Sequence, residues 1–133
     1  MEAIDLGRFI SEYRHKKFAY GQTDCNIFAS EWVDRVKNTE ITSSIVGNYD
    51  SVRGMLRFSK VKKIKKELEK AGYSQVKDTP VTGDILIRKD PAGFYHSAIV
   101  MHGCAYTMDK DKDLVKAQIQ HVMLPGTEIW RTT

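Results

Sequence analysis

The sequence contains only two cysteines in 133 residues, and this scarcity excludes several classes of protein. Two thiols are too few for a disulfide-rich secreted scaffold, and they favour free Cys25 and Cys104 over a single bridge between them. No Cys-x-x-Cys pair is present, so the sequence gives no support for a structural zinc site. We therefore expect no metal and no cofactor.

Long hydrophobic runs are also missing. No stretch approaches the roughly 20 apolar residues that a membrane-spanning helix needs, so we expect no membrane span. The first residues, Met1–Asp5, are acidic and lack the basic start and apolar run of a signal peptide. We therefore expect a protein that is made in the cytoplasm, where thiols stay reduced.

The length and composition predict one soluble domain over residues 1–133, with 41% hydrophobic and 29% charged residues. Much of the formal charge of +4 comes from the segment Lys60–Lys70. In this segment Val61, Ile64, Leu68 and Ala71 recur at helical spacing, which predicts an amphipathic helix with solvated lysines. No aromatic residues are interleaved to stack on bases, so we do not expect nucleic acid as a partner. An anionic polymer such as cell wall is compatible with the charge.

Apolar spacing predicts helices in the first half of the chain. They cover residues 3–16, 25–36 and 48–58, followed by the lysine-rich helix, which should end at Gly72 in a left-handed conformation. Short polar side chains that can cap two of them are Thr23 or Asp24 before the second helix, and Asp50 or Ser51 before the third.

Beyond residue 80 the pattern becomes that of strands. Short apolar or alternating runs are expected at 85–87, 97–101, 104–108, 115–119 and 128–131, and the run at 97–101 is apolar on both faces, as in a central strand. Helices followed by a mostly antiparallel sheet make an α+β fold. The alternating acids of Asp109–Asp113 resemble a calcium loop, but Leu114 and Gln120 occupy the positions that need glycine and glutamate.

Cys25 lies where the capping pattern places the first turn of the second helix. The free N–H groups of a helix start favour a thiolate, and a neighbouring imidazole would lower the thiol pKa further and carry the proton in acyl transfer. The alternative is that Cys25 is simply the first residue of that helix's apolar stripe.

Four histidines are available as a base: His15, His96, His102 and His121. His15 lies in a charged helix end, and His121 has no distinguishing feature. His96 opens the predicted central strand, where a sheet can offer a base to a helix terminus. His102 lies at the far end of the same strand, so it cannot serve the same site.

Four segments resemble the NlpC-like cysteine peptidases, and most closely their small phage-tail branch. The segment Phe18–Cys25, with Phe28, Ala29, Trp32 and Val33 after it, resembles the nucleophile segment. The other similar segments are Gly83–Leu86 with His96–Met101, Gly47–Ser51 with Gly54, and Ile129–Arg131. The resemblance spans most of residues 18–131.

The resemblance implies a papain-like fold, in which N-terminal helices pack on a mostly antiparallel central sheet. It implies that Cys25 is the nucleophile and His96 the general base, with Tyr20 beside the oxyanion. Asp24, like Tyr20, would lie near the substrate and the oxyanion, although a helix-capping role suits Asp24 better. The family's third residue orients the imidazole from the next strand, where Asp109, or less well Thr107, is available here.

The resemblance further implies a peptidase that opens peptide cross-links of bacterial cell wall through a Cys–His acyl-enzyme mechanism. Phage tail-tip or hub proteins would then be its partners, and the virion tail its destination. One alternative is a structural tail-tip or assembly protein that keeps the fold with little activity. Another is an amidase or acyltransferase that uses the same pair, because a fold alone does not fix a reaction.

Overall fold

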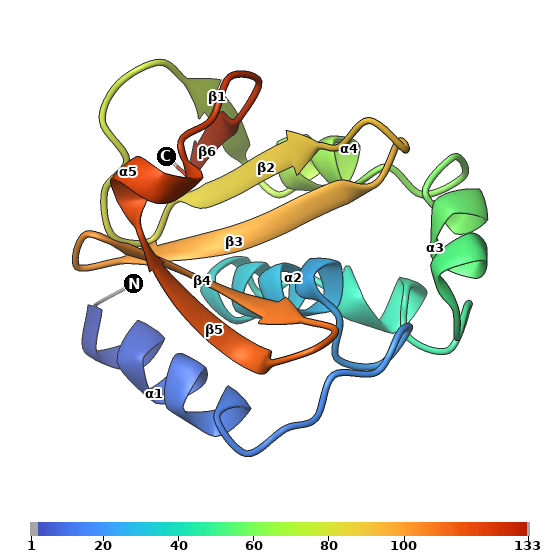
Figure 1. Ribbon diagram of the computed structural model, residues 1–133. Coiled ribbons are helices and arrows are strands. Elements are labelled where there is room, and N and C mark those ends of the chain that lie inside the picture. Colours follow the sequence, from blue (N-terminus) through green and yellow to red (C-terminus); the bar gives the residue numbers. More distant parts are fainter. Residues whose placement is uncertain (1–2, 133) are drawn as a thin grey trace.

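The structure is a computed structural model that describes residues 3–132. Helices dominate the first half and strands the second, as the sequence predicts (Figure 1). The helices are α1 (Ala3–Tyr13), α2 (Cys25–Lys37), the 3-10 turn η1 (Thr42–Ser44), α3 (Val52–Phe58), α4 (Ile64–Lys70) and α5 (Ile119–Val122). The strands are β1 (Tyr73–Val76), β2 (Ile85–Lys89), β3 (Tyr95–Met101), β4 (Cys104–Asp109), β5 (Asp113–Gln118) and β6 (Glu128–Thr132).

The six strands form one sheet in the order β1-β6-β2-β3-β4-β5, and every neighbouring pair is antiparallel. The α+β prediction is therefore confirmed. The central place of the strand that carries His96 is confirmed as well, since β3 lies between β2 and β4. Within residues 3–132, no helix has the length and apolar character that a membrane crossing requires.

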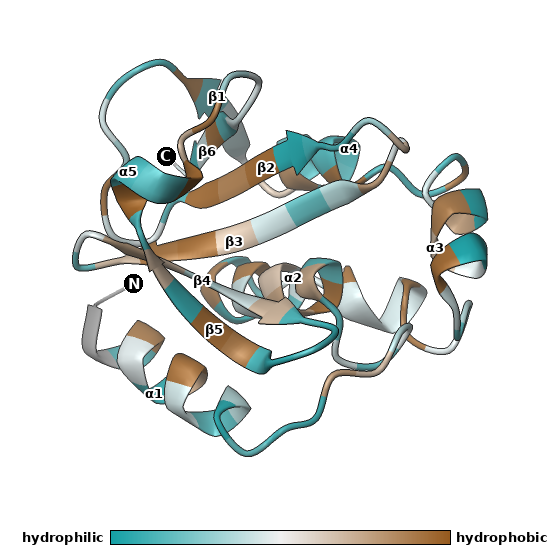
Figure 2. Cartoon of the chain, viewed as in Figure 1, coloured by the Kyte–Doolittle hydropathy of each residue, from teal (hydrophilic) through white to brown (hydrophobic). Residues whose placement is uncertain are grey.

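The main core lies between the helices and one face of the sheet. Four rings from α1 and α2 pack together there: Phe9, Tyr13, Phe28 and Trp32, with centroids 4.8–5.5 Å apart. Figure 1 shows α2 lying along β3 and β4. Figure 2 shows apolar residues along most of β2 and in the C-terminal half of β3. Each apolar side chain buried between α2 and the sheet contributes about 1.5–3 kcal/mol to stability, so this packing holds α2 on β3 and β4.

A second, smaller core covers the opposite face of the sheet. It consists of Leu86, Val100, Ala105 and Ile129, against which residues around α5 pack. The sequence did not predict α5, because its one turn follows directly on the alternating pattern of β5. The side chains of the sheet are thus covered on both faces near its middle, and the ends of the strands are left for a site.

The lysine-rich helix differs from the prediction at its start. It begins at Ile64, and Val61 lies in the preceding turn with 82% of its surface exposed, so its place in the apolar stripe was wrong. Ile64, Leu68 and Ala71 are buried as predicted. Gly72 ends the helix with φ of 93°, and the following residues form β1, which the sequence did not predict.

The two cysteines are free, as the sequence predicts. The acidic segment Asp109–Asp113 is the turn that joins β4 to β5, where Asp109 pairs with Asp113. No group of three or more His, Cys, Asp or Glu side chains in the described residues is arranged to hold a metal ion.

Candidate active site

A cavity of about 270 Å³ brings together the five residues predicted from the sequence: Tyr20, Asp24, Cys25, His96 and Asp109. They come from the loop before α2, the start of α2, the start of β3 and the end of β4. The remaining wall residues are Phe18, Val52, Met55, Asp90, Phe94, Met108 and Lys110. The fold therefore collects residues that are far apart in the chain around one hollow.

Asp24 builds the end of α2 on which Cys25 lies. One carboxylate oxygen accepts the N–H groups of Asn26 and Ile27, both at 3.1 Å. The other accepts the N–H of Gly21 at 2.9 Å and the hydroxyl of Tyr49 at 2.6 Å. The capping prediction for Asp24 is confirmed, and these four bonds fill the acceptor sites of the carboxylate. Asp24 is thus a structural support of the site that has no acceptor left for a substrate.

The turn before α2 depends on Gly21. Its φ is 79°, in the left-handed region where glycine carries no steric penalty. A side chain there would overlap the carbonyl oxygen of Tyr49. Gly21 therefore allows Tyr20 to line the cavity while the next backbone N–H turns to Asp24.

The thiol of Cys25 is almost buried, with 7% of the residue exposed. Its Sγ lies 4.0 Å from the carbonyl oxygen of Tyr95 on β3. Burial, with a smaller contribution from the neighbouring Asp24 carboxylate, raises the pKa of Cys25 to about 12, although nearby backbone N–H groups act in the opposite direction. This corrects the expectation that the helix start alone would favour a thiolate, because desolvation outweighs it. The thiol of Cys25 is neutral at pH 7 and needs a base.

His96 is held by a carboxylate that sequence reasoning missed. Its Nε2 lies 2.8 Å from Oδ2 of Asp90, and half of its side chain (52%) is exposed. Desolvation acts to raise the pKa of Asp90, but the hydrogen bonds from His96, Phe94 and Ala92 outweigh it and hold that pKa below its ordinary value. In a neutral imidazole whose Nε2–H donates to Asp90, Nδ1 carries the free lone pair. In that tautomer the ring accepts a proton at Nδ1.

Asp109 lines the same cavity but is engaged elsewhere. Its Oδ2 accepts the N–H of Asp111 at 3.0 Å within the β4–β5 turn. The other candidate, Thr107, donates its hydroxyl to the carbonyl of Ser97 at 2.7 Å. The carboxylate that holds the His96 ring is thus Asp90, and a catalytic role of Asp109 stays a prediction. Asp90 could have been noticed because Asp-Pro-x-Gly forms a tight turn that returns the chain to the start of β3.

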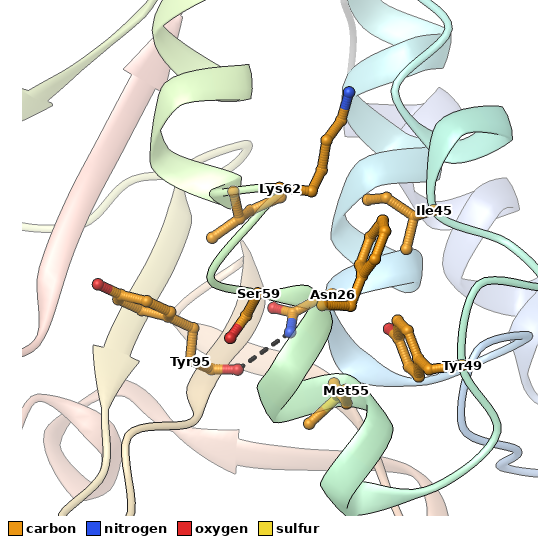
Figure 3. Close-up of a pocket in the computed structure, with 9 residues that line it drawn as sticks. Asn26, Ile45, Tyr49, Met55, Ser59, Lys62 and Tyr95 are labelled. Carbon is orange, nitrogen blue, oxygen red and sulfur yellow. Dashed lines mark hydrogen bonds between the residues drawn. The ribbon is translucent and has the colours of Figure 1, made fainter.

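Asn26 fastens the start of α2 to the strand that carries His96. Its Nδ2 donates to the carbonyl of Tyr95 at 3.1 Å, and its Oδ1 accepts the hydroxyl of Ser97 at 2.6 Å. Figure 3 shows the first of these bonds, beside a small cavity of about 30 Å³. Tyr95 and Ser97, to which Asn26 bonds, are the chain neighbours of His96, and Asn26 itself directly follows Cys25. The Asn26 side chain therefore fixes the separation of the two functional residues.

We expect Asn26→Ala to lower the free energy of unfolding by about 2 kcal/mol, because it leaves the buried hydroxyl of Ser97 without its acceptor. Urea unfolding of Asn26→Ala, Ser97→Ala and the double variant measures this loss. The sum of the two single losses should exceed the loss in the double variant by about 1 kcal/mol, because both single variants break the same bond. Losses that simply add would contradict the role of Asn26 as an anchor of β3.

Tyr20 completes the wall next to Cys25. Its ring packs edge-on against Phe18, with centroids 4.8 Å apart. Burial, followed by the nearby Cys25 and acidic side chains, raises the pKa of the Tyr20 hydroxyl. The hydroxyl is therefore protonated near pH 7 and can donate a hydrogen bond into the cavity.

The fold and this cavity define an α+β domain with a candidate cysteine–histidine centre. The chain belongs to the family described as a domain of unknown function, DUF6950, whose model matches residues 3–131. A comparison with curated proteins gives no match.

Proposed function

We propose that the protein is a papain-like cysteine peptidase of the NlpC type that hydrolyses amide bonds in bacterial cell-wall peptides. The observation that carries the proposal is the cavity shared by Cys25 and His96, in which Asp90 holds Nε2 and leaves Nδ1 as a proton acceptor. The wall substrate, the virion tail and tail-tip or hub partners rest on the sequence resemblance alone.

The first half of the proposed reaction forms a thioester. The S–H proton of Cys25 moves to Nδ1 of His96, and the sulfur attacks the carbonyl carbon of the amide. The backbone N–H of Cys25 lies at the start of α2 and Tyr20 lines the cavity, so this N–H and the Tyr20 hydroxyl are suited to donate to the oxyanion. His96 returns the proton to the amide nitrogen, the C–N bond breaks and the amine leaves.

The second half restores the enzyme. His96 takes a proton from a water molecule as the water oxygen attacks the thioester carbon, and the tetrahedral adduct then expels the sulfur. The sulfur regains the proton from His96, and the carboxylic acid is released. The ion-pairing carboxylate of Asp90 stabilises the imidazolium that forms in each half.

The test is hydrolysis of purified bacterial peptidoglycan, followed as newly exposed amino groups and by mass analysis of the released peptides. We expect Cys25→Ala to lower the rate at least about 1000-fold, because it removes the nucleophile. Cys104→Ala is the matched control and should retain the wild-type rate, since Cys104 lies on β4 outside the cavity. Equal rates for Cys25→Ala and wild type, or no release by wild type, would contradict the proposal.

A second candidate function is that of a structural tail-tip or assembly protein that keeps the peptidase fold. The burial of Cys25 and its raised pKa favour this candidate, because a neutral, covered thiol is inert unless a base acts on it. On this reading Cys25→Ala leaves the protein's association with its assembly partners unchanged, and wild type releases no amino groups from peptidoglycan.

A further inference from the structure

A second cavity, of about 250 Å³, is also lined by His96. It shares three residues with the cavity of Cys25, namely His96, Met108 and Asp109. The two cavities therefore have the candidate base as a common wall residue, and a group bound in the second cavity lies beside His96.

The second cavity lies beside the unpaired ends of β3 and β4. Their backbone pairing covers only Ile99–Met101 with Cys104–Tyr106. Beyond it the carbonyl of Ser97 is bonded by the hydroxyl of Thr107 instead of a backbone N–H, so the strands diverge. Residues of both strands and of α5 line the cavity: Ser97, Ala98, Thr107, Met108, His121 and Val122.

The walls of the second cavity combine apolar surface with one guanidinium. Leu86, Val122 and Leu124 supply the apolar part. Arg88 lies directly opposite His96 in the pairing of β2 with β3. No carboxylate among residues 3–132 lies within ion-pair distance of it, whereas Arg35 pairs with one carboxylate and Arg131 with two. Asp109 stands at the shared edge, where one of its oxygens accepts the Asp111 N–H.

We infer that this second cavity is a substrate subsite, in which Arg88 binds a carboxylate carried by the peptide beside the cleaved amide. The inference rests on the proposed function. A guanidinium offers parallel N–H donors that match the two oxygens of a carboxylate, and the partly enclosed wall strengthens such a pair relative to bulk water. The apolar wall suits the hydrocarbon part of the same residue.

Peptide binding to the Cys25→Ala protein tests the inference without turnover. The probes are acetyl-Ala-Glu-Lys-Ala with free carboxylates and acetyl-Ala-Gln-Lys-Ala amide, in which both carboxylates are replaced by amides. Amide-resolved NMR titration gives the affinity and the residues that respond. We expect the acidic peptide to bind about tenfold more tightly, with shifts at Arg88 and His96. Arg88→Gln should remove that preference.

Arg8→Gln is the matched control, since it removes one exposed guanidinium from α1 and lies outside both cavities. It should leave the preference for the acidic peptide intact. Equal affinities for the two peptides, or an unchanged preference in Arg88→Gln, would overturn the subsite. The peptidoglycan assay distinguishes failure of the proposed function from failure of the subsite. A protein that binds the acidic peptide through Arg88 but hydrolyses no peptidoglycan would contradict the peptidase activity and leave the subsite intact.

Discussion

Replacing His96 with alanine is expected to slow the alkylation of Cys25 by iodoacetamide at pH 7 by about 100-fold, the usual contribution of a positioned base. The thiol has a pKa of about 12 in its buried position, so almost none of it is thiolate at pH 7 without a proton acceptor. Mass spectrometry of the modified cysteines measures the rate at Cys25 and, in the same protein, at Cys104.

The pH dependence gives the sharper distinction. A raised pKa favours the protonated form up to the folded pKa, so the alkylation rate of His96→Ala should rise about tenfold per pH unit from pH 7 towards about 12. Wild type should depend on pH much less, because the imidazole takes the proton. His15→Ala, which changes an exposed histidine, is the control. A steep wild-type profile that matches His96→Ala would contradict the pairing and favour a structural role.

The same assay separates the two candidate orienting carboxylates. Asp90→Asn removes the charge that faces Nε2 of His96, and Asp109→Asn removes the charge predicted from the resemblance. If Asp90 orients the ring, only its replacement slows the alkylation of Cys25. Slower alkylation in Asp109→Asn alone would assign the role to β4.

The second large effect is on stability. We expect Asp24→Ala to lower the free energy of unfolding by about 4 kcal/mol, because it removes the cap of α2 and leaves the buried hydroxyl of Tyr49 and the N–H of Gly21 without an acceptor. Urea unfolding followed by circular dichroism measures the change.

Ser51→Ala is the matched comparison for Asp24→Ala. Ser51 caps α3 with one bond to the N–H of Gly54 at an exposed position, so its loss should be about 1 kcal/mol. Similar losses in the two variants would show that the buried bonds of Asp24 to Gly21 and Tyr49 add nothing to the cap.

The elements with strong periodicity could be predicted from the sequence. The apolar spacing from Cys25 onward gave α2, and its cap gave the place of the thiol. The run at 97–101 gave β3 because a strand covered on both faces is apolar throughout. Val61 was misplaced because spacing alone does not show where a helix begins. β1 was missed since it is short and its middle residues Ser74 and Gln75 are exposed.

The residues of the site were predicted less completely, because several of their contacts form only when separate elements pack together. Asp90 reaches His96 across the Asp-Pro-x-Gly turn, a local signal that was overlooked. Asn26 acts between α2 and β3, a contact that no local pattern contains. The pKa of Cys25 was expected to fall because the helix start is visible in the sequence. Its burial is not visible, since it depends on how β3 covers the thiol.

The strand β6 has a consequence for how the chain folds. It lies between β1 and β2, although residues 90–127 separate it from β2 and residues 77–127 separate it from β1. Until β6 pairs with β2, that strand, whose residues Ile85–Ile87 are apolar, has one unpaired edge that can pair with another chain. Insertion of a late segment between two earlier ones involves contacts of long sequence separation, which slow folding and prolong that exposure. Assembly of the sheet is therefore the step at which folding competes with aggregation.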